Sequence, residues 1–115
     1  MNSGAMKVEA KGSRVRVYLG SSDTWHGKAL YVAIVQEARR RGLAGATVVR
    51  GVMGFGAHSV IHEPHVFSLS SDLPVVVEIV DSPEKVRAFL PCLDEMVQEG
   101  MITISDCDIV RYAKS

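Results

Sequence analysis

Hydrophobic and polar positions alternate along the first regular segment of the chain, residues 14–19. Val15, Val17 and Leu19 occupy every second position, and the residues between them are charged or amphipathic. This period of two is typical of a β-strand with one buried face. We therefore predict a strand at residues 14–19.

The pattern changes to a period near 3.6 at residues 28–41, which predicts a helix. Arginines at 39–41 suit the negative end of the helix dipole, and Gly42 is a typical residue for ending a helix. Four apolar residues recur three or four positions apart and would form the buried stripe: Leu30, Ala33, Ile34 and Ala38.

Two further strands are expected at residues 46–52 and 74–80, which are rich in β-branched residues. The connection between them, residues 53–73, is about twenty residues long. Connections of this length in a small domain usually carry function. The long connection is therefore the first place to look for a binding site.

A second helix follows, for which Asp81 or Ser82 would be the N-cap and Pro83 the first turn. Its apolar period continues to Gly100. Two extended pieces, 101–104 and 108–112, complete the chain.

The element order β-α-β-β-α-β predicts an α+β, ferredoxin-like sandwich. Right-handed crossovers would place both helices on one face of a four-stranded antiparallel sheet. We expect one domain at residues 13–115, preceded by a flexible N-terminal lead at residues 1–12.

The strand at 74–80 carries apolar residues on both faces. Val75, Val77 and Ile79 would point to one face of the sheet, whereas Val76 and Val80 would point to the other. Because two helices cover one face only, a second cover is needed, and a symmetric oligomer of identical chains is the favoured answer. The C-terminal segment of the same chain is the alternative cover.

The composition is that of a folded globular domain, with 47% hydrophobic and 23% charged residues among 115. Acidic and basic residues balance at 13 each, which argues against nucleic acid as a partner. Residues 1–12 contain no apolar stretch of the signal-peptide kind. Cys92 and Cys107 lack a CxxC spacing, which favours reduced thiols and a cytoplasmic protein.

Three glycines, Gly51, Gly54 and Gly56, follow the second strand. Glycine lets a backbone approach a ligand closely, and exposed amides can bind an anion. A simple glycine-bent exit from the strand is the alternative. Together with the long connection, the pattern makes this segment a candidate ligand site.

Lys28 lies at the start of the first helix, where an anion would be stabilised. The preceding loop does not match a Walker phosphate loop, because six residues separate Gly20 from Gly27 and Ala29 follows the lysine. Lys28 is therefore a candidate for charge pairing with a phosphate, or an ordinary solvated lysine.

The long connection also contains His58, His62 and His65. Histidines close in sequence suggest zinc or copper, although their spacing repeats no known ligand pattern. Acidic residues are scattered, and no G-x-S-x-G nucleophile motif is present. We therefore expect a protein that is not an enzyme and needs no cofactor, with a small enzyme of unknown chemistry as a weaker alternative.

Five segments together resemble one protein family: residues 27–31, 37–39, 42–48, 50–56 and 72–75. The family is domain-of-unknown-function family one-hundred-and-ninety, which occurs in bacteria and archaea and is regarded as PII-like. The resemblance covers nearly the whole chain from Arg14 to Tyr112. It implies a ferredoxin-like fold assembled as a homotrimer, with the three sheets facing a central axis.

The resemblance also implies a ligand. Gly54-Phe55-Gly56 resembles the base of the mobile T-loop of PII signalling proteins, beside which an adenine nucleotide sits between subunits. By this likeness the predicted nucleotide site includes residues for charge pairing, backbone donation and packing: Lys28, Arg50, Gly51, Met53, Gly54, Phe55, Gly56, His58 and Arg111.

PII proteins carry a glycine-rich, lysine-containing phosphate loop, and the tight, acidic segment Asp81-Ser82-Pro83-Glu84-Lys85 has no such character. We therefore expect AMP or ADP as the effector rather than ATP. A membrane transporter or channel is a conceivable protein partner, because the family is often encoded beside fluoride exporters. The competing hypothesis is a metal-binding trimer of the copper-tolerance type that uses His58, His62 and His65.

Overall fold

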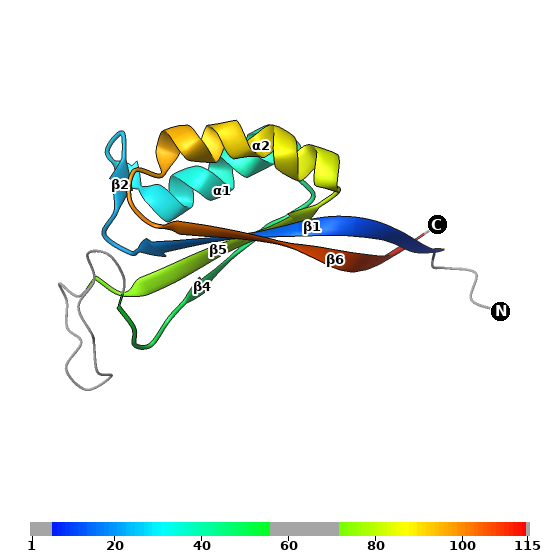
Figure 1. The fold of residues 1–115 in the computed structure, drawn as a ribbon, viewed down its shortest axis with the longest axis horizontal. Helices are drawn as coiled ribbons and strands as arrows, with labels where there is room; N and C mark the ends of the chain where they lie inside the picture. Colours follow the sequence, from blue (N-terminus) through cyan, green and yellow to red (C-terminus); the bar gives the residue numbers. More distant parts are fainter. Residues whose placement is uncertain (1–5, 56–71, 115) are drawn as a thin grey trace.

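The computed structural model describes residues 6–55 and 72–114. Figure 1 shows two helices lying over one face of a four-stranded sheet. The elements in chain order are β1 (Met6–Gly20), β2 (Thr24–Trp25), β3 (Lys28–Ala29), α1 (Leu30–Arg40), β4 (Ala46–Arg50), β5 (Pro74–Asp81), α2 (Pro83–Met96) and β6 (Met101–Ala113).

The four long strands form a sheet in the order β4-β5-β1-β6. Each neighbouring pair is antiparallel, and Val17 of β1 lies opposite Val77 of β5, which lies opposite Val48 of β4. Leaving aside the two-residue strands β2 and β3, the order along the chain is β-α-β-β-α-β. The predicted ferredoxin-like fold is confirmed.

The core lies between this sheet and the two helices. Odd-numbered residues of β1 and β5 point into it because side chains alternate along a strand. Val17, Val77, Ile34 and Leu93 are each 0% exposed. The apolar stripe predicted for the first helix is also buried. Burial of these faces is the main stabilising contribution to the fold.

A buried carboxylate joins the α1–β4 loop to the connection between β5 and α2. Asp81 Oδ2 accepts a hydrogen bond from Ala44 N at 2.9 Å, and Asp81 Oδ1 accepts one from Ser82 N at 2.7 Å. The N-cap itself is Ser82, whose hydroxyl accepts from Lys85 N at 3.2 Å. Of the two predicted cap residues, therefore, Ser82 caps the helix and Asp81 holds the neighbouring loop.

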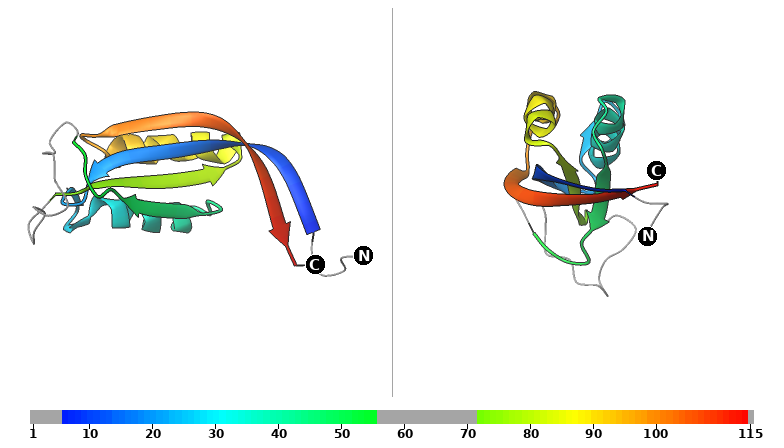
Figure 2. Two further views of the ribbon diagram at one scale, coloured as in Figure 1. Left: turned by 90° about the horizontal axis from the view of Figure 1, so that it is seen from below. Right: turned by 90° about the vertical axis from the view of Figure 1, so that its right-hand side faces the viewer.

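β1 and β6 continue far beyond the helices as a two-stranded ribbon (Figure 2). Met6 pairs with Ala113 at its tip. The described part of the predicted flexible lead, Met6–Gly12, is thus a strand, and the two predicted C-terminal pieces are one strand. Hydrogen bonding between the chain ends orders both segments.

The first helix begins two residues later than predicted, because Lys28 and Ala29 form β3. This short strand pairs with β2, and His26 and Gly27 form the turn between them with φ values of 48° and 81°. Positive φ at both turn residues is typical of a tight two-residue β-hairpin turn, in which glycine is favoured at the second residue, here Gly27. The hairpin lies at the start of α1.

The sheet face away from the helices is mixed rather than purely apolar. Val76 and Val80 are half-buried on it, and Val49 is 55% exposed. Between them, Arg16 Nε donates to Glu78 Oε2 at 2.8 Å, and this bond raises the pKa of the Arg16 guanidinium. At one end of this face, Ile109 and Arg111 of β6 line a pocket together with Glu78 and Val80. The C-terminal strand, which is the alternative cover, therefore lies beside part of this face.

Candidate functional site

The two stems of the long connection are bonded to each other. Gly51 N, just after β4, donates to Pro74 O at the start of β5 at 2.7 Å. A Cβ at Gly51 would lie 2.8 Å from Pro74 Cγ, a distance that real Cβ atoms essentially never show. Glycine is therefore required at 51 by the close approach of Pro74, and its amide is already engaged.

Beyond Gly51 the described stem exposes apolar side chains. Val52 and Phe55 are each 75% exposed and Met53 is 51% exposed. Three large apolar side chains in succession at the surface are unusual for an isolated domain. The arrangement provides a surface on which a planar ring or another chain can pack.

Arg50 supplies a positive charge at the end of β4, next to this surface. It is exposed, and its Nη2 lies 3.5 Å from the hydroxyl oxygen of Tyr31 on α1. Its guanidinium has further donors for an anion. Tyr31 is not among the candidate site residues predicted from the sequence, and α1 brings it next to Arg50.

The returning stem is tied to the loop that follows β1. Ser21 N donates to Leu73 O at 2.8 Å, and Leu73 N donates to Ser21 Oγ at 3.0 Å. Ser22 N donates to Asp72 Oδ1 at 3.0 Å. These three bonds fix Asp72 and Leu73 beside the β2–β3 hairpin.

Two of the predicted site residues lie away from the glycine-rich stem. Lys28 Nζ donates to Gln36 Oε1 at 2.8 Å, on the outer side of α1. Arg111 pairs with Val8 in the protruding ribbon, at the other end of the sheet. Within one chain the structure therefore brings together Arg50, Gly51, Met53, Gly54 and Phe55, but neither Lys28 nor Arg111 joins them.

The remaining predicted residues lie outside the described residues. From the predicted nucleotide site these are Gly56 and His58. From the metal-binding alternative they are His58, His62 and His65. Among residues 6–55 and 72–114, no group of three or more histidine, cysteine, aspartate or glutamate side chains could hold a metal ion.

The acidic segment Asp81–Lys85 has a structural role. Besides the Ser82 cap, Lys85 Nζ donates to Gly42 O at the end of α1 at 3.0 Å. The segment lies at the far end of β5 from Gly51, and 8 residues of strand span roughly 25 Å. The preference for AMP or ADP, which we drew from this segment, stays a prediction.

Within the described part of the chain, none of the helices combines the length and apolar character needed to cross a bilayer.

The family model DUF190, described as an uncharacterized ACR family, matches residues 12–109. The chain belongs to this family. A UPF0166 protein of Aquifex aeolicus is 36% identical over 100 residues, covering 87% of this chain and 94% of the relative. A UPF0166 protein of Methanocaldococcus jannaschii is 36% identical over 102 residues, covering 88% and 94%.

Among solved structures, the fold of this DUF190 protein is similar to CPII of Thiomonas intermedia K12, a nitrogen regulatory PII-like protein bound to ADP, AMP and bicarbonate. The TM-score is 0.59 at 18% identity, with 90% of this chain and 92% of CPII covered. At that identity the likeness establishes a shared PII-like fold. The predicted membership of domain-of-unknown-function family one-hundred-and-ninety is confirmed by the family model.

Proposed function

We propose that this protein is a trimeric PII-like regulator that binds an adenine nucleotide, AMP or ADP, in clefts between subunits. The observation that carries the proposal is the fold shared with CPII, whose structure holds ADP and AMP. The stem at Arg50–Phe55 adds a cation and exposed apolar side chains to that fold.

The separation of the predicted residues favours a site between chains. Arg111 pairs with Val8 in the ribbon and lines a pocket with Thr47 and Glu78, whereas the stem begins at Arg50, the opposite end of β4. A neighbouring chain would therefore supply the Arg111 of a nucleotide site at the stem. The half-buried valines on the open sheet face would be covered by neighbouring copies in a symmetric assembly. A trimer then places one chain's Arg111 within reach of another chain's stem.

In this proposal each part of the stem has a distinct role. Arg50 pairs with phosphate, with Arg111 as a further cation, and Gly54 offers a backbone donor. Lys28, which is bonded to Gln36 on α1, is not included in this set. Met53 and Phe55 pack against the base. Gly51 holds the stem against Pro74 rather than donating to the ligand, because its amide is already bonded.

Regulation would act through the 53–73 loop. A ligand shifts an equilibrium between loop states by its differential contacts with them. A protein partner, such as a membrane transporter or channel, would read the loop state. The protein would thus act by binding rather than by catalysis, in the cytoplasm.

Calorimetric titration with AMP, ADP and ATP tests nucleotide binding. We expect saturable heat with AMP or ADP, and its loss in Gly51→Val, because the added side chain must displace Pro74. Gly45→Ala is the matched control, since a Cβ at Gly45 meets nothing within 4 Å. No heat with any of the three nucleotides would refute the proposal.

Light scattering tests the assembly separately. We expect a trimer for the natural protein and dissociation in Val76→Lys, because a buried, unpaired charge is costly. Val32→Lys, on the exposed side of α1, should remain trimeric. A lone protomer at working concentration would contradict the proposed clefts.

A further inference from the structure

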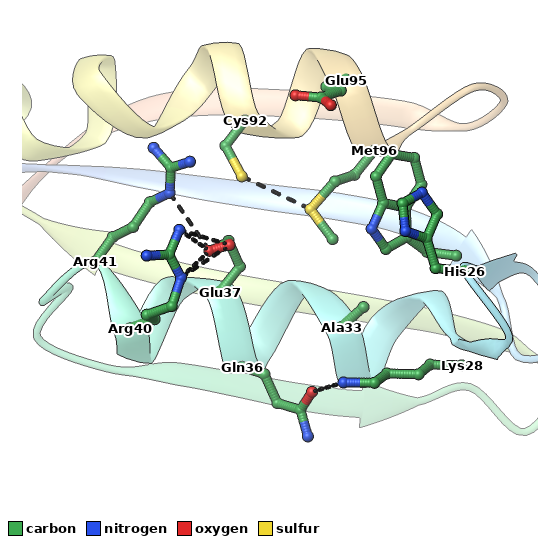
Figure 3. Close-up of a pocket in the computed structure, with 11 residues that line it drawn as sticks. His26, Lys28, Ala33, Gln36, Glu37, Arg40, Arg41, Cys92, Glu95 and Met96 are labelled. Atoms are coloured by element: carbon green, nitrogen blue, oxygen red, sulfur yellow. Dashed lines mark hydrogen bonds and ion pairs between the residues drawn. The ribbon is translucent and has the colours of Figure 1, made fainter.

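A groove lies on the outer side of the helix layer, between α1 and α2. Figure 3 shows it with the sheet behind the helices. Its volume is about 540 Å³, within the range of roughly 300–1,000 Å³ typical of small-molecule sites. It is separate from the Arg50–Phe55 stem, none of whose residues lines it.

The floor of the groove is apolar and composed of small or soft side chains. Ala33 of α1 and Cys92 and Met96 of α2 form it, and these three are 8%, 8% and 6% exposed. Cys92 Sγ lies 3.7 Å from Met96 Sδ. Burial raises the pKa of the Cys92 thiol, so the floor is uncharged at neutral pH. Such a floor suits a hydrocarbon or aromatic body.

One end of the groove is cationic. Arg40 Nη2 donates to Glu37 Oε2 at 3.2 Å, and Arg41 Nε lies 3.6 Å from Glu37 Oε1. Two guanidinium groups therefore share one carboxylate. Because Arg41 makes the longer contact and its side chain is 44% exposed, its remaining donors are available to a second anion.

The other end is aromatic. The rings of Trp25 and His26 stack with centroids 4.3 Å apart and an interplanar angle of 10°. Both lie on the β2–β3 hairpin, where His26 is near Met96 (Figure 3) and Trp25 is stacked on His26. The hairpin thereby supplies a flat aromatic wall at this end of the groove.

The charges lining the groove favour a monoanion. Three cations, Lys28, Arg40 and Arg41, outnumber two carboxylates, Glu37 and Glu95, by one. The two negative charges of a phosphate dianion would exceed this single excess positive charge, and the dianion would be repelled by Glu37 and Glu95. A ligand with one carboxylate would balance the excess charge. Lys28 is in turn bonded to Gln36, so Arg41 is the principal partner.

We propose that this groove binds a small organic carboxylate with an apolar, planar body. The carboxylate pairs with Arg41, and the body lies over Ala33, Cys92 and Met96 toward Trp25. Ala33 to Arg40 spans seven residues of helix, roughly 10 Å, which sets the length of the ligand. This would be a second ligand site, distinct from the proposed nucleotide cleft.

The probe 3-phenylpropionate tests the site on the natural protein. Trp25 is the only tryptophan of the chain, so its fluorescence reports the groove wall directly. We expect saturable binding of the carboxylate and at least tenfold weaker binding of the neutral 3-phenylpropan-1-ol. Arg41→Ala should weaken carboxylate binding by roughly tenfold, the size of a lost charge-assisted hydrogen bond.

Arg39→Ala is the matched control, because Arg39 lies in the same helical turn but does not line the groove. It should bind as the natural protein does. A second readout is alkylation of the two thiols, in which the probe should slow modification of Cys92 and leave Cys107 unchanged. Equal affinity for acid and alcohol, equal effects of the two arginine variants, or an unprotected Cys92 would each overturn the inference. Loss of probe binding in Gly51→Val but not in Arg41→Ala would assign the probe to the nucleotide cleft instead.

Discussion

Asp81→Ala should destabilise the domain strongly, although the residue lies outside both proposed sites. The side chain is 8% exposed and accepts two backbone hydrogen bonds, from Ala44 N and Ser82 N. Hydrogen bonds to a charged group contribute about 1.5–3 kcal/mol each. Because Ala44 is exposed and water can replace part of its bond, we expect a loss of about 3 kcal/mol in the free energy of unfolding.

The assay is denaturant unfolding followed by circular dichroism, at one fixed protein concentration because assembly contributes to stability. For a domain of this size, 3 kcal/mol corresponds to a fall in Tm of roughly 10–20 °C. Asp81→Asn keeps one oxygen acceptor and should lose about half as much. Ser82→Ala removes the helix cap and should cost about 1 kcal/mol. A loss below about 1 kcal/mol for Asp81→Ala, or equal losses for the alanine and asparagine variants, would refute this account of the carboxylate.

Three further predictions concern the helix layer and the hairpin. The hydrogen bond from Arg40 lowers the pKa of the Glu37 carboxyl. The stability contributed by the ionised Glu37 carboxylate is therefore present above the ordinary carboxyl pKa and is lost as pH falls through the lowered pKa. Glu37→Gln should therefore be less stable than the natural protein at pH 7 and equally stable in strong acid, as measured by urea unfolding. Burial raises the pKa of the Cys92 thiol, so the stability contributed by the neutral thiol is lost as pH rises through that raised pKa. Cys92 should therefore react more slowly than half-buried Cys107 with a disulfide reagent at pH 8. Comparable rates for the two thiols would contradict the burial of Cys92. Ser21→Ala removes the acceptor for Leu73 N and should lower the fluorescence anisotropy of Trp25, whereas Ser22→Ala, which keeps the backbone donor to Asp72, should not.

The sequence predicts the fold well where a single period persists. The alternation at Val15, Val17 and Leu19 identifies the core of β1, and the stripe containing Ile34 identifies α1. Met6, Val8 and Ala10 also alternate with polar residues, but at even-numbered positions, out of phase with Val15, Val17 and Leu19, and all three are exposed. Their order depends on pairing with β6, about a hundred residues later, which local pattern does not reveal.

The sequence predicts which residue types form the candidate site, but not how their side chains are arranged in space. The glycines after β4 indicate a close backbone approach, and the structure finds the partner to be Pro74, a residue of the same chain. Residue type identifies Lys28 and Arg111 as cations but not the direction in which each side chain points. The groove is lined by the small side chains of Ala33 on α1 and Cys92 on α2, which come together only when the two helices are packed.

The two proposed sites are connected through the hairpin. Its base is held by Asp72 and Leu73, the returning stem of the long connection, and its tip carries Trp25, the wall of the outer groove. A ligand that moves the stem must strain these three hydrogen bonds or carry the hairpin with it. Occupancy of the groove would resist that movement, because the hairpin then packs against the ligand. If both sites bind, linkage requires each ligand to change the affinity of the other by the same factor. Ser21→Ala should reduce that factor without abolishing either binding event, since the backbone bond from Ser21 N remains.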